Sequence, residues 1–109
     1  MTQVAVIHAA FEETPNTVAF VEVGDRTGDE ALEYAYRWTN NVMGSWSIKK
    51  EYLGDHENGD YNEDVTVMAP LHVDENGQEW GHRSTSMGDM MLLDGVKYKV
   101  AAFGFEELV

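Results

Sequence analysis

The chain has 109 residues, of which 43% are hydrophobic and 11% aromatic, and 20 carboxylates against seven lysines and arginines give it a net charge of -13. This length and composition predict one folded domain, residues 1–109, rather than a disordered chain. The absence of cysteine excludes a disulfide framework, a thiolate metal site and a thiol nucleophile. The negative charge opposes direct binding to nucleic acid or to an anionic membrane.

The first predicted elements form a β-hairpin. Residues 4–11 and 17–23 are β-rich runs, and the turn-prone segment 13–16 separates them. The N-terminal residues show neither the basic start nor the cleavage pattern of a signal peptide, and no apolar run is long enough to cross a bilayer. We therefore expect a cytoplasmic protein.

An amphipathic helix is predicted next, from about residue 28 to residue 40. Thr27 and Glu30 form a capping-box pattern at its start. Glu33 and Arg37 have the spacing of an i, i+4 ion pair on the polar side. The apolar stripe at helical period consists of Ala31, Ala35, Trp38 and Val42, with Leu32 beside it.

The second half of the chain reads as loops and short strands. Residues 44–48 are predicted to form a short strand, and residues 51–64, with six carboxylates and no lysine or arginine, an exposed loop or irregular hairpin. Strand character resumes at 64–73, where Pro70 indicates an edge position or a bulge. Segments 74–77 and 94–95 are predicted hairpin turns. The pattern as a whole predicts an α+β fold, in which one helix packs on an antiparallel sheet of five or six strands.

The sequence holds no convincing metal site. The histidines lack the i, i+4 spacing of a helical zinc motif. Residues 60–64 begin like a calcium loop, but Val65 stands where the sharp turn needs glycine, and Leu71 where the bidentate glutamate belongs. We expect no metal and no cofactor. The four histidines are His8, His56, His72 and His82.

The one local hint of catalysis is His82, followed by Ser84, Thr85 and Ser86. Sequence neighbours on a strand point apart, so a hydrogen-bonded nucleophile and base are not expected here. Hydroxyls in such a segment are expected to cap backbone groups instead. We therefore predict no catalytic residues and no enzymatic activity.

One pattern covers about half of the chain. It consists of Arg83-Ser84-Thr85-Ser86-Met87-Gly88-Asp89, Tyr98, Val100, Gly104-Phe105, Tyr36-Arg37-Trp38-Thr39-Asn40-Asn41 and Ser45-Trp46. It resembles small proteins encoded by phages and mobile elements, and residues 51–64 lie outside the resemblance. Many small acidic phage proteins, such as anti-CRISPR and anti-restriction proteins, block the DNA-binding surface of host machinery. The resemblance implies such a role and carries over no catalytic residue.

The acidic residues concentrate in two clusters, residues 22–33 and 51–64. We expect a non-enzymatic protein that uses these clusters to occupy the basic surface of a host nucleic-acid-binding defence complex, without itself contacting nucleic acid or membrane. The predicted partner-binding residues are Glu22, Asp25, Asp29, Glu30, Glu33, Glu51, Asp55, Glu57, Asp60, Tyr61, Glu63 and Asp64.

The alternative is a structural or accessory module that self-associates through a sheet edge and is acidic only for solubility. The sequence leaves open the oligomeric state, the partner, and whether the two clusters share one face.

Overall fold

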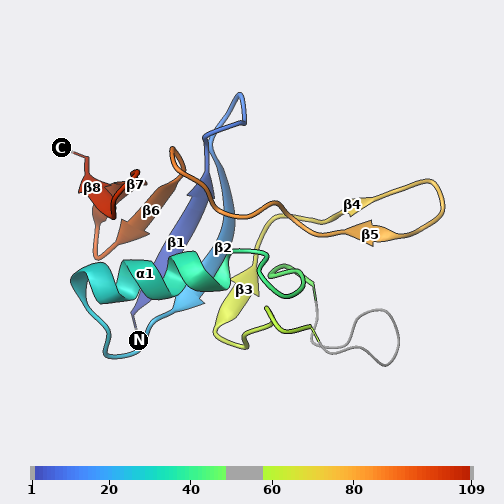
Figure 1. Cartoon of the computed structure of the whole chain (residues 1–109). Coiled ribbons are helices and arrows are strands. Elements are labelled where there is room, and N and C mark those ends of the chain that lie inside the picture. Colours follow the sequence, from blue (N-terminus) through green and yellow to red (C-terminus); the bar gives the residue numbers. More distant parts are fainter. Residues whose placement is uncertain (1, 49–57, 109) are drawn as a thin grey trace.

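The computed structural model describes residues 2–48 and 58–108. Its main feature is a six-stranded antiparallel sheet with the order β3-β2-β1-β6-β7-β8, joined by one helix, which confirms the predicted α+β fold (Figure 1). A separate two-stranded sheet pairs β4 with β5. The elements are β1 (Gln3–His8), β2 (Asn16–Glu22), α1 (Gly28–Trp38), β3 (Val65–Val67), β4 (His72–Val73), β5 (Glu79–Trp80), β6 (Met90–Leu93), β7 (Val96–Val100) and β8 (Phe105–Glu107).

Turn chemistry sets the pairing of neighbouring strands. Asp94 and Gly95 connect β6 to β7 and both have positive φ, 51° and 80°, which is the backbone of the tight hairpin turn that an Asp-Gly pair favours. In the β4–β5 turn, the Asp74 carboxylate accepts the backbone N–H groups of Asn76 and Gln78. Both turns were predicted from the sequence, and both are confirmed.

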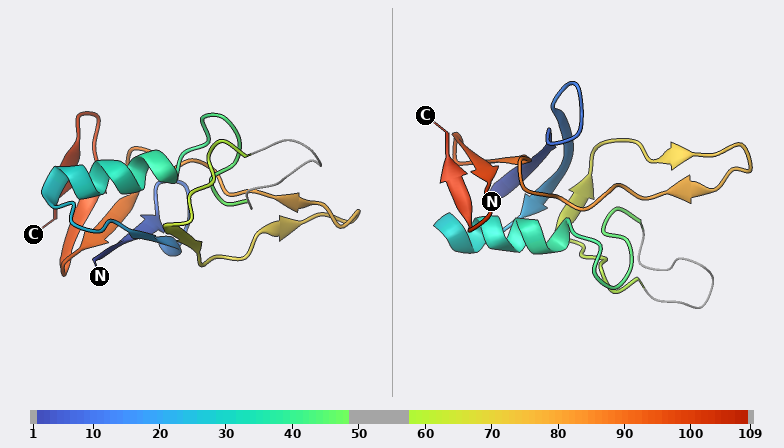
Figure 2. Two further views of the ribbon diagram at one scale, coloured as in Figure 1. Left: turned by 90° about the horizontal axis from the view of Figure 1, so that it is seen from below. Right: turned by 45° about the horizontal axis from the view of Figure 1, so that its top comes forward.

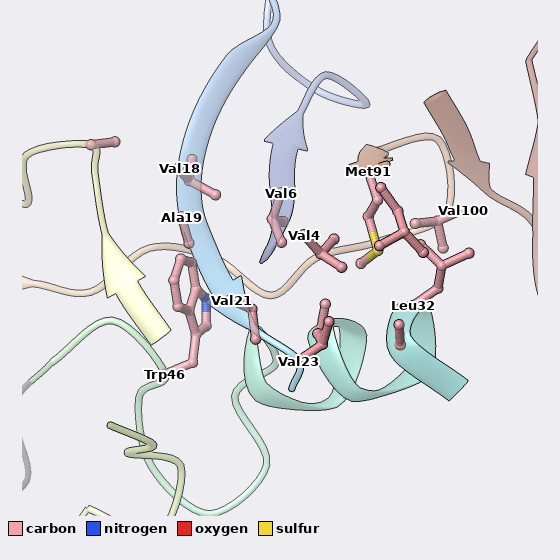
Figure 3. Close-up of a cluster of buried hydrophobic side chains, with 14 residues drawn as sticks. Val4, Val6, Val18, Ala19, Val21, Val23, Leu32, Trp46, Met91 and Val100 are labelled. Atoms are coloured by element: carbon pink, nitrogen blue, oxygen red, sulfur yellow. The ribbon is translucent and has the colours of Figure 1, made fainter. Parts of the chain in front are cut away.

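The core lies between one face of the sheet and α1. Strand alternation places Val4, Val21 and Met91 on that face, and Leu32 from the helix points toward Met91 and Val100 (Figure 3). Burying a leucine side chain fully contributes about 1.5–3 kcal/mol, so this contact is a large part of what holds the helix. The buried hydrophobic cluster contains Val4, Val6, Val18, Ala19, Val21, Val23, Ala31, Leu32, Ala35, Trp46, Ala69, Met91, Leu93 and Val100.

The helix begins where the sequence predicts but ends at Trp38, two residues early. Thr39 turns back and donates its Oγ1–H to the carbonyl of Ala35, at 2.8 Å, and the Asn40 side chain donates to the carbonyl of Tyr36. These bonds satisfy carbonyls that further helical turns would otherwise use. Val42, predicted on the apolar stripe, therefore lies outside the helix and is 65% exposed.

Two further expectations about segments need correction. Residues 44–48 form bends and turns rather than a strand. The predicted strand 64–73 splits around Pro70 into β3 and β4, which belong to different sheets. Its first half, β3, does lie at an edge of the main sheet, as the proline indicated.

The β4–β5 hairpin projects from the body of the molecule, on the side away from β7 and β8 (Figures 1 and 2). Val73 and Trp80 are each more than half exposed on it. Within the described residues, no helix is long and apolar enough to span a membrane.

Candidate functional site: the acidic surface and the buried ion pairs

The first acidic cluster extends from the end of β2 into α1. Glu22 is half-buried at the last position of β2, and Asp25 is exposed in the loop that follows. Asp29, Glu30 and Glu33 are exposed on α1, because Ala31, Leu32 and Ala35 occupy the side of the helix that faces the sheet. A carboxylate in the first helical turn also interacts favourably with the positive end of the helix dipole.

The second cluster is described only from residue 58 onward, so the predicted residues Glu51, Asp55 and Glu57 lie outside the described residues. Tyr61 and Glu63 are exposed, as a partner-binding role requires, and Asp64 is half-buried.

Asp64 joins the two clusters. Its backbone carbonyl accepts the N–H of Glu22 at 2.8 Å, and its carboxylate accepts the Tyr34 hydroxyl of α1 at 2.6 Å. Burial and this hydrogen bond to Asp64 raise the pKa of Tyr34, which favours the protonated phenol that donates the bond. Arg26 lies 3.7 Å from the centre of the Tyr34 ring. Part of each cluster thus meets at one corner of the molecule.

Glu33 does not lie at this corner. Tyr34 lies on the side of α1 that contacts Asp64, whereas Glu33 lines a pocket against β7 and β8. Glu33 and the Glu22–Asp64 corner are therefore on different sides of the helix.

Asp60 was predicted in an exposed loop but is fully buried. One carboxylate oxygen accepts three consecutive backbone N–H groups, from Val42, Met43 and Gly44, at 2.7, 2.9 and 2.7 Å. The other pairs with Arg37 at 3.3 Å. Successive N–H groups of this kind form an anion-binding nest, and here the chain fills it with its own carboxylate. Asp60 is therefore unavailable to a partner.

The side chain of Asn58 also holds the segment that follows α1 in place. Its side chain accepts the N–H of Ser45, at 3.0 Å, and donates to the carbonyls of Ser45 and Ile48. Residues 58–60 thereby fix the path of the segment that follows α1. The sequence predicted only an exposed loop or irregular hairpin for residues 51–64, so sequence reasoning missed this role.

The arginines bind carboxylates and aromatic rings of the chain itself. The predicted pair of Glu33 with Arg37 does not form, because Arg37 is held by Asp60 and by the ring of Trp38, whose centre is 4.1 Å away. Arg83 binds Asp89 at 2.7 Å and Glu12 at 2.8 Å. In the part of the chain that the structure describes, Lys97 and Lys99 on β7 make no ion pair within 4 Å and are exposed.

Asp89 resembles Asp60 in its surroundings. It is fully buried and accepts the N–H groups of Ala9, Ala10 and Ser86 at 2.8–2.9 Å. Burial by itself would raise the pKa of Asp89, but the hydrogen bonds from Arg83 and from these backbone groups outweigh it and hold the pKa well below its usual range.

A chain of hydroxyls connects β1 to the end of the helix. Thr85 Oγ1 donates to Thr39 Oγ1 at 2.8 Å, and Thr39 in turn donates to the carbonyl of Ala35. Because the Thr85 proton is used in this way, its oxygen accepts from His8 Nε2, at 3.0 Å. Burial and the nearby Arg83 lower the pKa of His8, which favours its neutral form. The side chains of His8, Thr85 and Thr39 therefore form one hydrogen-bonded chain with a structural role.

The serine hydroxyls near His82 make hydrogen bonds with the backbone. Ser84 Oγ accepts the N–H of Asn41 at 2.8 Å, and Ser86 donates to the carbonyl of Ser84, which confirms the predicted backbone capping for both serines. His82 Nε2 contacts the carbonyl of Ala69, and its ring lies against Trp46. Among residues 2–48 and 58–108, no three histidine or carboxylate side chains are grouped to hold a metal ion.

Comparison of the chain with protein-family models, with curated proteins and with solved structures finds no match.

Proposed function

We propose that this protein binds a basic surface of another protein and thereby competes with nucleic acid for that surface. The observation that carries the proposal is the contrast between its arginines and its exposed carboxylates. The described arginines are engaged by the chain's own carboxylates and aromatic rings, whereas Asp25, Asp29, Glu30, Glu33 and Glu63 are exposed. The surface therefore presents carboxylates that a cationic partner can neutralise.

The resemblance to small phage proteins supports one class of partner: nucleic-acid-binding defence machinery, the target of anti-CRISPR and anti-restriction proteins. Such partners bind many phosphates through clustered lysine and arginine. The exposed carboxylates of α1, together with Asp25 and Glu63, are the groups of this chain that would take the place of those phosphates.

The experiment measures DNA binding by purified CRISPR effector complexes and restriction enzymes, with and without the protein. Inhibition is expected at 50 mM salt and is expected to weaken strongly at 500 mM, because the Debye length falls from about 14 Å to about 4 Å. The variant Asp29→Asn/Glu30→Gln/Glu33→Gln should lose inhibition.

A matched control removes the same charge elsewhere. Glu13, Glu75 and Glu79 are exposed, in the β1–β2 turn and on the projecting hairpin, and the variant Glu13→Gln/Glu75→Gln/Glu79→Gln should still inhibit. No inhibition at low salt, or inhibition that both variants retain, would contradict the proposal.

The alternative role, a self-associating accessory module, is favoured by one feature. Val73 and Trp80 are exposed to 54% and 55% on the projecting β4–β5 hairpin, where a second copy could cover them. Both edges of the main sheet, β3 and β8, are only three residues long, which makes edge pairing less suitable. Sedimentation at several concentrations separates the two roles, since self-association predicts an oligomer without any other protein.

A further inference from the structure

A small pocket lies between α1 and the β7–β8 hairpin. Its volume is about 230 Å³. Pockets for drug-sized ligands have about 300–1,000 Å³, and a dry cavity of about 150 Å³ holds benzene, so this pocket suits one side chain rather than a cofactor. The lining residues are Glu33, Tyr36, Val100, Ala101, Ala102, Gly104 and Phe105.

Among the lining residues that the structure describes, Glu33 alone is charged. Its expected partner, Arg37, is instead held by the buried carboxylate of Asp60. Within the described residues Glu33 has no ion pair. Because Arg37 pairs with Asp60, the Glu33 carboxylate lines an otherwise neutral pocket without an ion-pair partner in the described part of the chain.

The walls of the pocket are aromatic and aliphatic. The rings of Tyr36 and Phe105 pack edge to face with centres 6.2 Å apart, and Val100 is buried beside them. A carboxylate beside aromatic rings matches the guanidinium of arginine, which pairs with carboxylates, stacks on aromatic faces and has an aliphatic stem that packs on apolar surface. An ammonium group is more strongly hydrated and stacks less well.

The rim of the pocket supports contact with a protein. Phe103, at the tip of the β7–β8 turn between the lining residues Ala102 and Gly104, is 98% exposed. An aromatic side chain held fully in water is a common anchor of protein interfaces.

We propose that this pocket receives an arginine side chain of a basic protein partner, with Glu33 pairing with the guanidinium. The inference rests on the proposed function, since it names where one cationic side chain of such a partner docks.

The test uses Nα-acetyl-L-arginine amide as the probe and follows the backbone amide signals of the protein by NMR. Shifts are expected at Val100, Ala101 and Gly104 and should be absent with the citrulline analogue, which has the same shape without the charge. Glu33→Gln should weaken binding at these amides by about two- to fivefold, the range that one partly exposed ion pair supplies. Glu13→Gln removes the same charge from an exposed position in the β1–β2 turn, outside the pocket lining, and should leave binding unchanged.

Equal binding by Glu33→Gln and the unmodified chain, or probe shifts confined to other surfaces, would overturn the inference. The proposed function is tested separately by inhibition of DNA binding. If inhibition occurs and the pocket amides do not respond to the probe, the pocket inference fails alone; if the pocket responds and no defence complex is inhibited, the proposed function fails alone.

Discussion

Asp60 and Asp89 show how two carboxylates of a very acidic chain serve the fold itself. Each is fully buried, accepts three backbone N–H groups, and pairs with an arginine, Arg37 for Asp60 and Arg83 for Asp89. Charge-assisted hydrogen bonds of this kind are stronger than neutral ones, and they offset the cost of moving the charge out of water. Both residues therefore fix chain segments that carry few hydrophobic contacts.

Replacing Asp60 by asparagine tests this role at the residue scale. The neutral amide would leave Arg37 without its charged partner and would weaken the bonds from the three N–H groups, so Asp60→Asn should lower the free energy of unfolding by about 3 kcal/mol. Urea unfolding measures the change. Glu63→Gln removes the same charge from an exposed position three residues away and should stay within about 0.5 kcal/mol of the unmodified chain. Similar stability of the two variants would contradict a structural role for Asp60.

At the scale of elements, the loop after α1 is held against the segment that leads from β5 to β6. Trp46 is buried and donates its indole N–H to the carbonyl of Arg83 at 2.8 Å. Gly81 approaches this loop so closely that a Cβ atom there would overlap Ser45 Oγ and lie 3.0 Å from Ser47 Oγ. Ser45 Oγ is itself buried without a hydrogen-bond partner among the described residues.

Gly81→Ala should therefore lower the free energy of unfolding by about 1–3 kcal/mol, the usual cost of overpacking. Ser45→Ala removes the atom that would clash and also removes an unsatisfied hydroxyl, so it should be neutral or slightly stabilising alone. The double variant Gly81→Ala/Ser45→Ala should recover much of the loss, which urea unfolding of all three variants would show. Additive effects of the two changes would mean that the close approach of Gly81 to Ser45 is not what limits this position.

At the scale of the whole molecule, the structure is somewhat more open than its length requires. Its accessible surface is 6,873 Å², against about 6,100 Å² expected for a compact chain of this mass, and the projecting β4–β5 hairpin contributes to the difference. Its radius of gyration is 13.9 Å, against about 13 Å expected. A net charge of -13 on this body favours expansion by self-repulsion, which protonation relieves at low pH.

Lowering the pH should nevertheless also remove a stabilising contribution from the surroundings of Asp89. The pKa of Asp89 is depressed in the folded chain. When the pH falls below 3.8, the ordinary pKa of aspartate, the unfolded chain therefore binds a proton that the folded chain does not, and the free energy of unfolding decreases as the pH falls. The lowered pKa of His8 acts in the same direction below 6.5. Asp89→Asn should be about 3 kcal/mol less stable at pH 7, and this gap should narrow below pH 3.8.

Urea unfolding of both proteins between pH 7 and pH 3 measures the gap, and comparing them cancels the general effect of charge repulsion. Asp25→Asn, at an exposed site, serves as the control and should show no gap that depends on pH. A constant difference between the Asp89 variant and the unmodified chain across this range would show that the charge of Asp89 does not contribute to stability.

Local patterns in the sequence determined the α+β class, the start of the helix and the turns at 74–77 and 94–95. These features depend on residue periodicity and on turn residues such as Asp94 and Gly95, whose backbone preference acts over a few positions. The edge position of β3 likewise agrees with the nearby Pro70, whereas the split of residues 64–73 between two sheets was not predicted.

Only the tertiary structure decided which carboxylates are exposed. Asp60 and Glu63 are close in the sequence and equal in charge, yet one is buried in a nest of N–H groups from residues 42–44 and the other faces water. The sequence also did not show that Arg37 pairs with Asp60 and not with Glu33. A buried charge requires a partner, whereas an exposed charge is already solvated. Because Arg37 pairs with the buried Asp60, Glu33 has no arginine partner and lies in the pocket lining beside Tyr36 and Phe105.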